Sequence, residues 1–516
     1  MTSFPLTNRL DQTATGSWLR DWRFSLACVI LLACVVRLYN LGYSSLSHDE
    51  AGRANFALSA TLLEARWFPP LHYVLLWVVR HTLGGSEIAL RLPSALAGIA
   101  CVVTLFLFTR RYLDNWAGVC VAAVAAGHAE LVVFSRMVKE FSLESLMTVA
   151  VSWAGVEAYR NLTTRSVRTF AVCSVLALGL TYTGSLVVSA WGLVILIAWW
   201  SAPRDQRVIG HRFAAAVLFV IISEMLCYWW LSGAFNRGPT AYHYGIERGA
   251  WPANFQLVTL ATWLFAQSYG ALRYVLGVSS LYSPIDVLIA GYEILLVAVA
   301  FAYLRKRIPS VCAAAAVLWL VTVVVGAMGM WPYGEFHTMM FMVPLICLAV
   351  GCGISQTARK FGRSLPTALL VLVCIVNPAA RACKNTMVSP RQREHLRPIM
   401  AYVERHAQPG DGIFAYYAAG AGVEHYGKRH DLPTLRQPTN DRGHLSVFSE
   451  RFVEFARDHR RVWFVFTHDW GDERKTWVAH LKRRFQLADK IEVADASAHL
   501  FVVAPESSAS GFSPQH

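Results

Sequence analysis

Runs of mostly apolar residues, each long enough to cross a lipid bilayer, recur along this chain and constrain its fold more than any other feature. Crossing the hydrocarbon core takes about 20 such residues in a helix, which satisfies its own backbone hydrogen bonds. Eleven runs of this kind lie near residues 24–41, 92–109, 116–134, 141–159, 168–182, 184–200, 213–231, 285–303, 309–328, 338–354 and 366–380. With 55% hydrophobic and 16% charged residues, the composition is too apolar for an ordinary soluble protein. The sequence predicts an all-α polytopic membrane protein.

Basic residues mark one side of these runs and predict the orientation. They gather between alternate runs, in the groups Arg110 and Arg111; Arg160, Arg165 and Arg168; Arg204, Arg207 and Arg212; Arg305, Lys306 and Arg307; and Arg359, Lys360 and Arg363. The positive-inside rule places this side in the cytoplasm. The first run follows a polar segment without a small-residue cleavage site, so we expect it to be retained. The net charge of +14 then reflects loop anchors at lipid headgroups, and nucleic-acid binding is disfavoured.

Eleven runs that start inside end outside, and this predicts two domains of different character. Residues 1–380 form the membrane domain, and residues 381–516 form a small α/β domain on the outer, periplasmic face of the cell inner membrane. Two outer segments are long, about 42–91 and about 232–284. In the first, the Pro69-Pro70 breaker separates a helix over 52–66 from an apolar helix over 71–81 that is too short to span and suits the membrane interface.

Two adjacent acids, Asp49 and Glu50, stand just beyond the first run, within a few residues of hydrocarbon. Acids in that position are costly to ionise and are often functional. One of them could accept a proton from an acceptor hydroxyl, and the pair would also suit a divalent cation. Alternatively, the pair caps the helix that follows, because the helix dipole favours acids at its N-terminus.

Two further corners on the outer side carry polar side chains. Residues 135–144 join the third and fourth runs and include Arg136, Lys139, Glu140 and Glu144. Either the bases hold an anionic phosphate while an acid faces a sugar, or the charges form an ion-pair ladder along one helix face. Residues 331–337 end the ninth run, where an aromatic belt with a Pro-Gly turn is the alternative to substrate contact by Tyr333, Glu335 and His337.

The first outer loop adds Arg91 and His72 as candidates for contact with a phosphate or another part of the substrate. The histidines and eleven cysteines show no metal-ligand spacing, and most cysteines lie inside apolar runs. We therefore assign no metal site and no certain cofactor.

In their order along the chain, these features resemble the GT-C glycosyltransferases, especially bacterial relatives of protein O-mannosyltransferases and aminoarabinose transferases. The resemblance rests on short motifs: His48-Asp49-Glu50 in a large first outer loop, Pro69-Pro70-Leu71-His72-Tyr73, Arg91-Leu92-Pro93-Ser94, the stretch from Arg136 to Glu144, and the corner Trp331-Pro332-Tyr333-Gly334. That corner departs from the aromatic order usual in the family.

The resemblance implies inverting transfer of one sugar from a polyprenyl-phosphate donor to a glycan, lipid or protein acceptor of the cell envelope. Asp49 would be the general base and Glu50 its support. Lys139 and Arg136 would neutralise the leaving phosphate, and Glu140 or Glu144 would orient the acceptor or sugar.

Two other classes of function remain open on the sequence. A transporter or flippase of a lipid-linked glycan would also need many spans and an anionic lipid site, but it should carry charges at mid-membrane. Glu224, inside the seventh run, is one such charge. A non-catalytic subunit of an envelope polysaccharide assembly would use the outer domain but should lack an acid or a base, and neither is missing here.

Overall fold

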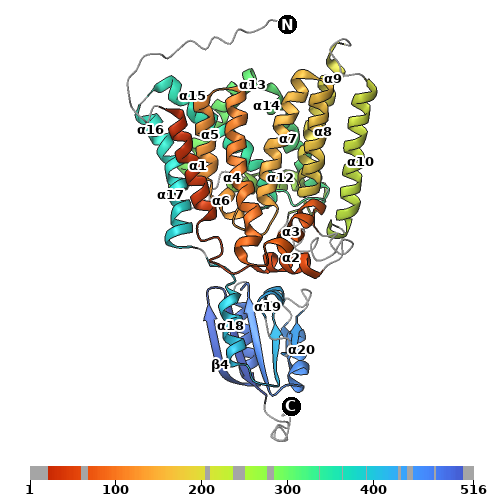
Figure 1. Cartoon of the computed structure of the whole chain (residues 1–516), viewed down its shortest axis with the longest axis vertical. Coiled ribbons are helices and arrows are strands. Elements are labelled where there is room, and N and C mark those ends of the chain that lie inside the picture. Colours follow the sequence, from red (N-terminus) through yellow and green to blue (C-terminus); the bar gives the residue numbers. More distant parts are fainter. Residues whose placement is uncertain are drawn as a thin grey trace.

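The chain folds into a helical bundle followed by a smaller α/β domain, each with its own hydrophobic core (Figure 1). The computed structural model describes residues 21–59, 68–203, 210–235, 250–275, 284–335, 337–362, 364–390, 392–427, 432–437, 445–469 and 472–503. The bundle and the domain are joined near residue 390, and short helices α2 (His48–Ser59) and α3 (Pro70–Thr82) lie at the end of the bundle that faces the domain (Figure 1).

A helical stretch coincides with every one of the eleven apolar runs. The helices are α1 (Trp22–Leu38), α4 (Glu87–Tyr112), α5 (Asn115–Gly127), α6 (Ala129–Phe134), α7 (Phe141–Asn161), α8 (Thr164–Leu180), α9 (Gly184–Ser201), α10 (Gly210–Phe235), α13 (Pro284–Arg307), α14 (Pro309–Ala327) and α15 (Val343–Phe361), which follows the 3-10 turn η4 (His337–Met342). The last run is a continuous stretch of α16 (Leu365–Val371), η5 (Leu372–Val376), α17 (Asn377–Cys383) and η6 (Lys384–Val388).

Four details differ from the sequence-based expectation. The first loop helix begins at His48, and not at residue 52 as predicted. The third run is two helices, because the chain turns at His128, between α5 and α6. The last helical stretch continues to Val388, beyond the predicted end at 380. The second long loop contains helix α12 (Leu257–Val275), which the sequence did not reveal. The predicted end of the first loop helix, at Arg66, lies outside the described residues.

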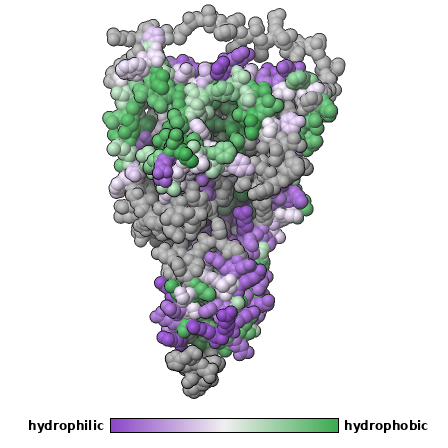
Figure 2. Space-filling model, turned by 180° about the vertical axis from the view of Figure 1, so that it is seen from behind, coloured by the Kyte–Doolittle hydropathy of each residue, from purple (hydrophilic) through white to green (hydrophobic). Residues whose placement is uncertain are grey.

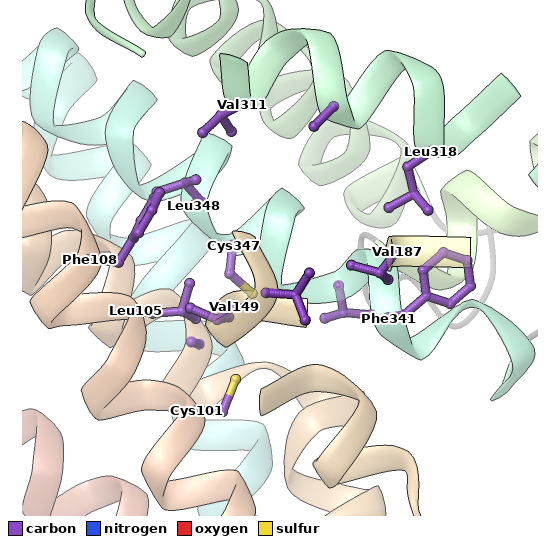
Figure 3. Close-up of a cluster of buried hydrophobic side chains, with 14 of the residues drawn as sticks. Cys101, Leu105, Phe108, Val149, Val187, Val311, Leu318, Phe341, Cys347 and Leu348 are labelled. Atoms are coloured by element: carbon purple, nitrogen blue, oxygen red, sulfur yellow. The ribbon is translucent and has the colours of Figure 1, made fainter. Parts of the chain in front are cut away.

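Six helical segments within the described ranges are long and apolar enough to cross a membrane. Large apolar side chains lie exposed on their outer surfaces, and the bundle shows broad hydrophobic areas where the α/β domain is mostly hydrophilic (Figure 2). Such a surface is stable only against lipid, so the chain is a multi-pass membrane protein. Inside the bundle, α4, α7, α14 and α15 contribute Leu105, Phe108, Val149, Leu318 and Leu348 to one packed cluster (Figure 3).

The α/β domain is built on a five-stranded sheet of order β2-β1-β3-β5-β4. Strands β1 (Asp411–Ala415), β2 (Thr434–Arg436) and β3 (Arg461–Thr467) are parallel, and β4 (Gln486–Val493) and β5 (Ala496–Val502) form an antiparallel hairpin beside β3. Helices α18 (Leu396–His406), α19 (Gly420–Tyr426), α20 (Leu445–Arg457) and α21 (Glu473–Lys482) accompany the sheet. Strand β3 is buried along nearly its whole length, as expected for a central strand.

Candidate active site at the start of helix α2

Helix α2 begins at His48, directly before the acidic pair, and Glu50 serves as part of its cap. Glu50 Oε2 accepts the backbone N–H of Ser47 at 3.0 Å, three residues back. This is the reciprocal half of a capping box, in which an acid at the third helical position satisfies a backbone donor that the helix leaves free. The capping alternative raised by the sequence therefore applies to Glu50.

Glu50 is also one half of a buried ion pair with Arg91 of α4. Arg91 Nε lies 2.9 Å from Glu50 Oε1 and Nη2 lies 3.0 Å from Oε2, and both side chains are 3% exposed. The remaining donors of Arg91 bind the carbonyls of Leu41, Ser44 and Ser45 at 2.9 to 3.0 Å. All five guanidinium N–H groups are thus used. As placed, Arg91 fixes the loop before α2 and has no donor left for a phosphate.

Asp49, one residue earlier, has a very different environment. Its carboxylate Oδ2 lies 2.6 Å from Lys139 Nζ, and its side chain is 60% exposed, whereas that of Lys139 is 12% exposed. The Lys139 ammonium holds the pKa of Asp49 well below its usual range, against the opposing effect of desolvation. The ammonium also lies 5.3 Å from the centre of the Phe141 ring, an attractive cation–π distance. Asp49 is therefore an ionised, accessible carboxylate on a firmly held helix.

Residues 135–140, which we call the Lys139 corner, reach α2 through two more contacts. Val138 donates its N–H to Glu50 Oε1 at 2.8 Å. Glu140 is buried and pairs with Arg53 of α2, whose Nη1 lies 2.8 Å from its Oε2. Burial raises the pKa of Glu140, but the positive charges of Arg53 and its basic neighbours together keep the pKa below its ordinary value. Arg53 is a site residue that the sequence analysis missed, since nothing local distinguishes it from other loop arginines.

The corner is a turn, so the ion-pair ladder that a helix would give does not form there. Arg136 instead donates to the carbonyls of Val36, Arg37, Tyr39 and Asn40 at 2.8 to 3.2 Å and caps the C-terminus of α1. Glu144, in the first turn of α7, is buried and accepts hydrogen bonds from Thr183 at the start of α9. Neither residue reaches Asp49 or Lys139 through a hydrogen bond or ion pair that the described side chains form.

The three other predicted substrate contacts, His72, His337 and Tyr333, lie around this network. His72 of α3 is buried near Glu140, and burial lowers its pKa to about 4, so the imidazole is neutral. The His337 ring lies 5.5 Å from the Phe141 ring, which places the 331–337 corner beside the Lys139 corner. Tyr333 is buried within that corner, where its hydroxyl is 2.9 Å from Ser268 Oγ and accepts the Trp319 Nε1–H at 3.0 Å.

Acids and bases from three corners of the bundle are thus gathered at the end that faces the α/β domain. Of the three carboxylates at the start of α2 and in the Lys139 corner, only Asp49 is accessible. Its ionised oxygen can take a proton from a hydroxyl, and the neighbouring ammonium can balance a developing or arriving negative charge. Among the described residues, no group of three or more His, Cys, Asp or Glu side chains is placed to hold a metal ion.

Comparison with known proteins supports the predicted resemblance. Residues 68–230 match the family model of dolichyl-phosphate-mannose-protein mannosyltransferases. The structure is similar to the Archaeoglobus fulgidus oligosaccharyltransferase tethered with an acceptor peptide, with a TM-score of 0.51 and 11% identity, over 88% of this chain and 70% of that one. ArnT from Cupriavidus metallidurans, solved bound to undecaprenyl phosphate, aligns over 93% of this chain and 98% of its own, with a TM-score of 0.46 and 13% identity.

No match was found among curated proteins. The family match spans helices α3 to α10, and the likeness to the archaeal protein shows a shared fold. The predicted resemblance to membrane glycosyltransferases of the GT-C type is confirmed.

Proposed function

We propose that this protein is an inverting glycosyltransferase that moves a sugar from a polyprenyl-phosphate donor to an envelope glycan, lipid or protein. The observation that carries the proposal is the accessible Asp49 carboxylate, 2.6 Å from the Lys139 ammonium, on a helix held by buried ion pairs. A general base next to a phosphate-binding cation is what a single displacement at an anomeric carbon needs. The match of residues 68–230 to the dolichyl-phosphate-mannose-protein mannosyltransferase family supports a lipid-linked donor.

In this reaction the acceptor hydroxyl oxygen attacks the anomeric carbon of the donor. The bond between that carbon and the phosphate oxygen breaks, and its electron pair leaves with the polyprenyl phosphate. Asp49 takes the hydroxyl proton, and Lys139 balances the charge on the departing phosphate. Glu50 and Arg91 hold the start of α2, so that Asp49 keeps its place during the reaction.

The ion pair between Asp49 and Lys139 also explains how one lysine can serve both the carboxylate and the donor phosphate. A carboxylate whose pKa is held low by an adjacent ammonium is a weak base. When an anionic donor phosphate arrives, it competes with Asp49 for Lys139. As the ammonium turns to the phosphate, the pKa of Asp49 rises and the carboxylate becomes a better base. The base is therefore strengthened when the donor is in place.

The proposed site lies at the outer, periplasmic face, and the helix geometry supports this. Lys139 and Glu140 directly precede α7, and Arg160 lies in the last turn of this 21-residue helix. A helix of that length spans about 30 Å, the thickness of the hydrocarbon core. At the far end of α7, Arg160 donates a hydrogen bond to the carbonyl of Arg307 at 2.9 Å. The basic groups around Arg160 and around Arg307 therefore lie on the same side of the bundle. The positive-inside rule makes that side cytoplasmic and the site side outer.

The decisive experiment compares purified Asp49→Asn with wild type, using a polyprenyl-phosphate sugar and membrane acceptors. Loss of the base should lower the rate of sugar transfer by about 100-fold to 10,000-fold. Asp472→Asn is the matched control, because Asp472 also pairs with a lysine, Lys475, at 2.8 Å, but both are about three-quarters exposed on the α/β domain. Full activity of folded Asp49→Asn would refute the assigned base. Movement of labelled lipid across proteoliposomes without sugar transfer, by the wild type, would favour a flippase instead.

A further inference from the structure

The loop that leads into helix α2 is held by the α/β domain as well as by the bundle. Arg397 of α18 donates to the carbonyls of Gly42 at 3.3 Å and Tyr43 at 2.9 Å. His395 Nδ1 lies 2.9 Å from Ser45 Oγ, and the Tyr426 hydroxyl accepts the Leu46 N–H at 2.7 Å. Four of the five residues from Gly42 to Leu46 are therefore tied to a domain with no assigned role.

The contact closest to the proposed base is made by Glu394. Its Oε2 accepts the backbone N–H of His48, the first residue of α2, at 2.5 Å. The first N–H groups of a helix have no partner within it, and a negative charge beside them stabilises that end. Glu50 satisfies the N–H of Ser47, and Glu394 satisfies the next one from a different domain. Asp49 follows directly.

Glu394 is itself held in a particular orientation. His468, directly after strand β3, places its Nδ1 2.7 Å from Glu394 Oε1. Glu394 and His468 both have a positive φ, of 50° and 63°, a conformation that residues other than glycine rarely adopt. Strain of this kind persists where the surroundings impose it, and it is concentrated at functional sites. Tyr417, which follows strand β1, packs its ring 6.0 Å from that of His48.

We propose that the α/β domain completes the catalytic site, with Glu394 as a positioning residue that sets Asp49 relative to Lys139 through the N–H of His48. His468 orients Glu394 in this arrangement. The inference rests on the proposed function, since it assigns Asp49 as the base. Small displacements of a reacting group have large effects on rate, so a carboxylate one residue from the base is well placed to control it.

The proposed positioning role of Glu394 can be separated from a role in attaching the α/β domain, because other contacts also hold the domain against the bundle. Arg397, His395 and Tyr426 hold the loop independently of Glu394. Replacing Glu394 should therefore loosen the first turn of α2 while the domain stays attached. Donor binding depends on the bundle and should change little.

The test compares Glu394→Ala and Glu394→Gln in the full-length protein in detergent or nanodiscs. Glu473→Ala is the matched control, because Glu473 accepts a hydrogen bond from Tyr416 within the domain at 2.7 Å. We expect Glu394→Ala to lower kcat by up to about 100-fold with the donor KM unchanged. Glu394→Gln keeps an acceptor oxygen for His48 and should recover part of the loss. Glu473→Ala should keep wild-type kcat.

A second readout needs no substrate. Amide hydrogen exchange should increase at His48 and Asp49 in Glu394→Ala, and remain unchanged in helix α7. Wild-type kcat in a folded Glu394→Ala protein, or unchanged exchange at the start of α2, would overturn the inference. Absence of sugar transfer by the wild type would instead overturn the proposed function, and the exchange result would still decide whether Glu394 holds α2.

Discussion

The substitution Glu50→Gln probes the buried ion pair that holds α2, and its effect can be worked out from the contacts. Glu50 Oε1 accepts Arg91 Nε–H and the Val138 N–H, and Oε2 accepts Arg91 Nη2–H and the Ser47 N–H. Glutamine keeps one oxygen, so two of these four donors must face its NH2 group whichever way the amide turns. Both ion-pair partners are 3% exposed, and water cannot replace the lost acceptor. Removing one partner of such a pair costs about 3–5 kcal/mol of stability.

Asp49→Asn, one position earlier, is the matched comparison. Asp49 is 60% exposed and Lys139 is 12% exposed, so water can solvate one side of this ion pair, and its loss should cost less than loss of the fully buried Glu50 pair. Thermal unfolding in detergent, followed by tryptophan fluorescence at one scan rate, should show Glu50→Gln melting well below wild type and Asp49→Asn melting close to it. Adding Arg91→Met to Glu50→Gln should recover part of the loss, because the unpaired buried charge is removed. Equal midpoints for wild type and Glu50→Gln would refute the reasoning.

Two further predictions follow from the same structure. Lys139→Gln removes the cation that lowers the pKa of Asp49, so the pKa should return toward about 3.9 and the acid limb of the pH profile of kcat/KM should move to higher pH; an unmoved limb would contradict the pairing. Gly351→Ala would place a Cβ 2.4 Å from Val121 Cα in the neighbouring helix, and should lower stability by about 1–3 kcal/mol in the same melting assay. Gly192→Ala, with nothing within 4 Å, is its control and should melt at or above the wild-type temperature.

The apolar runs predicted the helices because each run must satisfy its own backbone in lipid, a constraint that acts locally. Helix α12 was missed because its apolar stretch, Leu257–Leu272, is shorter than a full span. Its place in the bundle depends on contacts such as that of Ser268 with the buried Tyr333 hydroxyl at 2.9 Å, which joins residues 65 apart in the chain. The turn at His128 has a similar cause, since the ring lies 2.9 Å from the carbonyl of Val275. Such contacts between residues far apart in the chain cannot be predicted from local sequence patterns.

The site shows the same division between what is local and what is not. Topology placed Asp49 and Lys139 at one end of the bundle, which the sequence could predict. The actual pairing joins residues 90 apart in the chain, and that of Glu50 with Arg91 joins residues 41 apart. The alternative ladder through Arg136 needed a helix at the Lys139 corner, and the chain forms a turn there. Choice of partner depends on that turn, which the charge pattern does not specify.

Burial then decides which of the paired carboxylates is free to react. Each of the three acids has a basic partner, so charge alone does not distinguish them. Glu50 and Glu140, at 3% and 2% exposure, cannot change partner without leaving a buried charge uncompensated, a state that costs several kcal/mol. Asp49, which is 60% exposed, can separate from Lys139, because water can solvate the carboxylate and an incoming anionic group can take its place beside the ammonium. In the proposed reaction the two buried pairs therefore fix the geometry, and proton transfer falls to Asp49, the one of these three carboxylates whose ion pair can open.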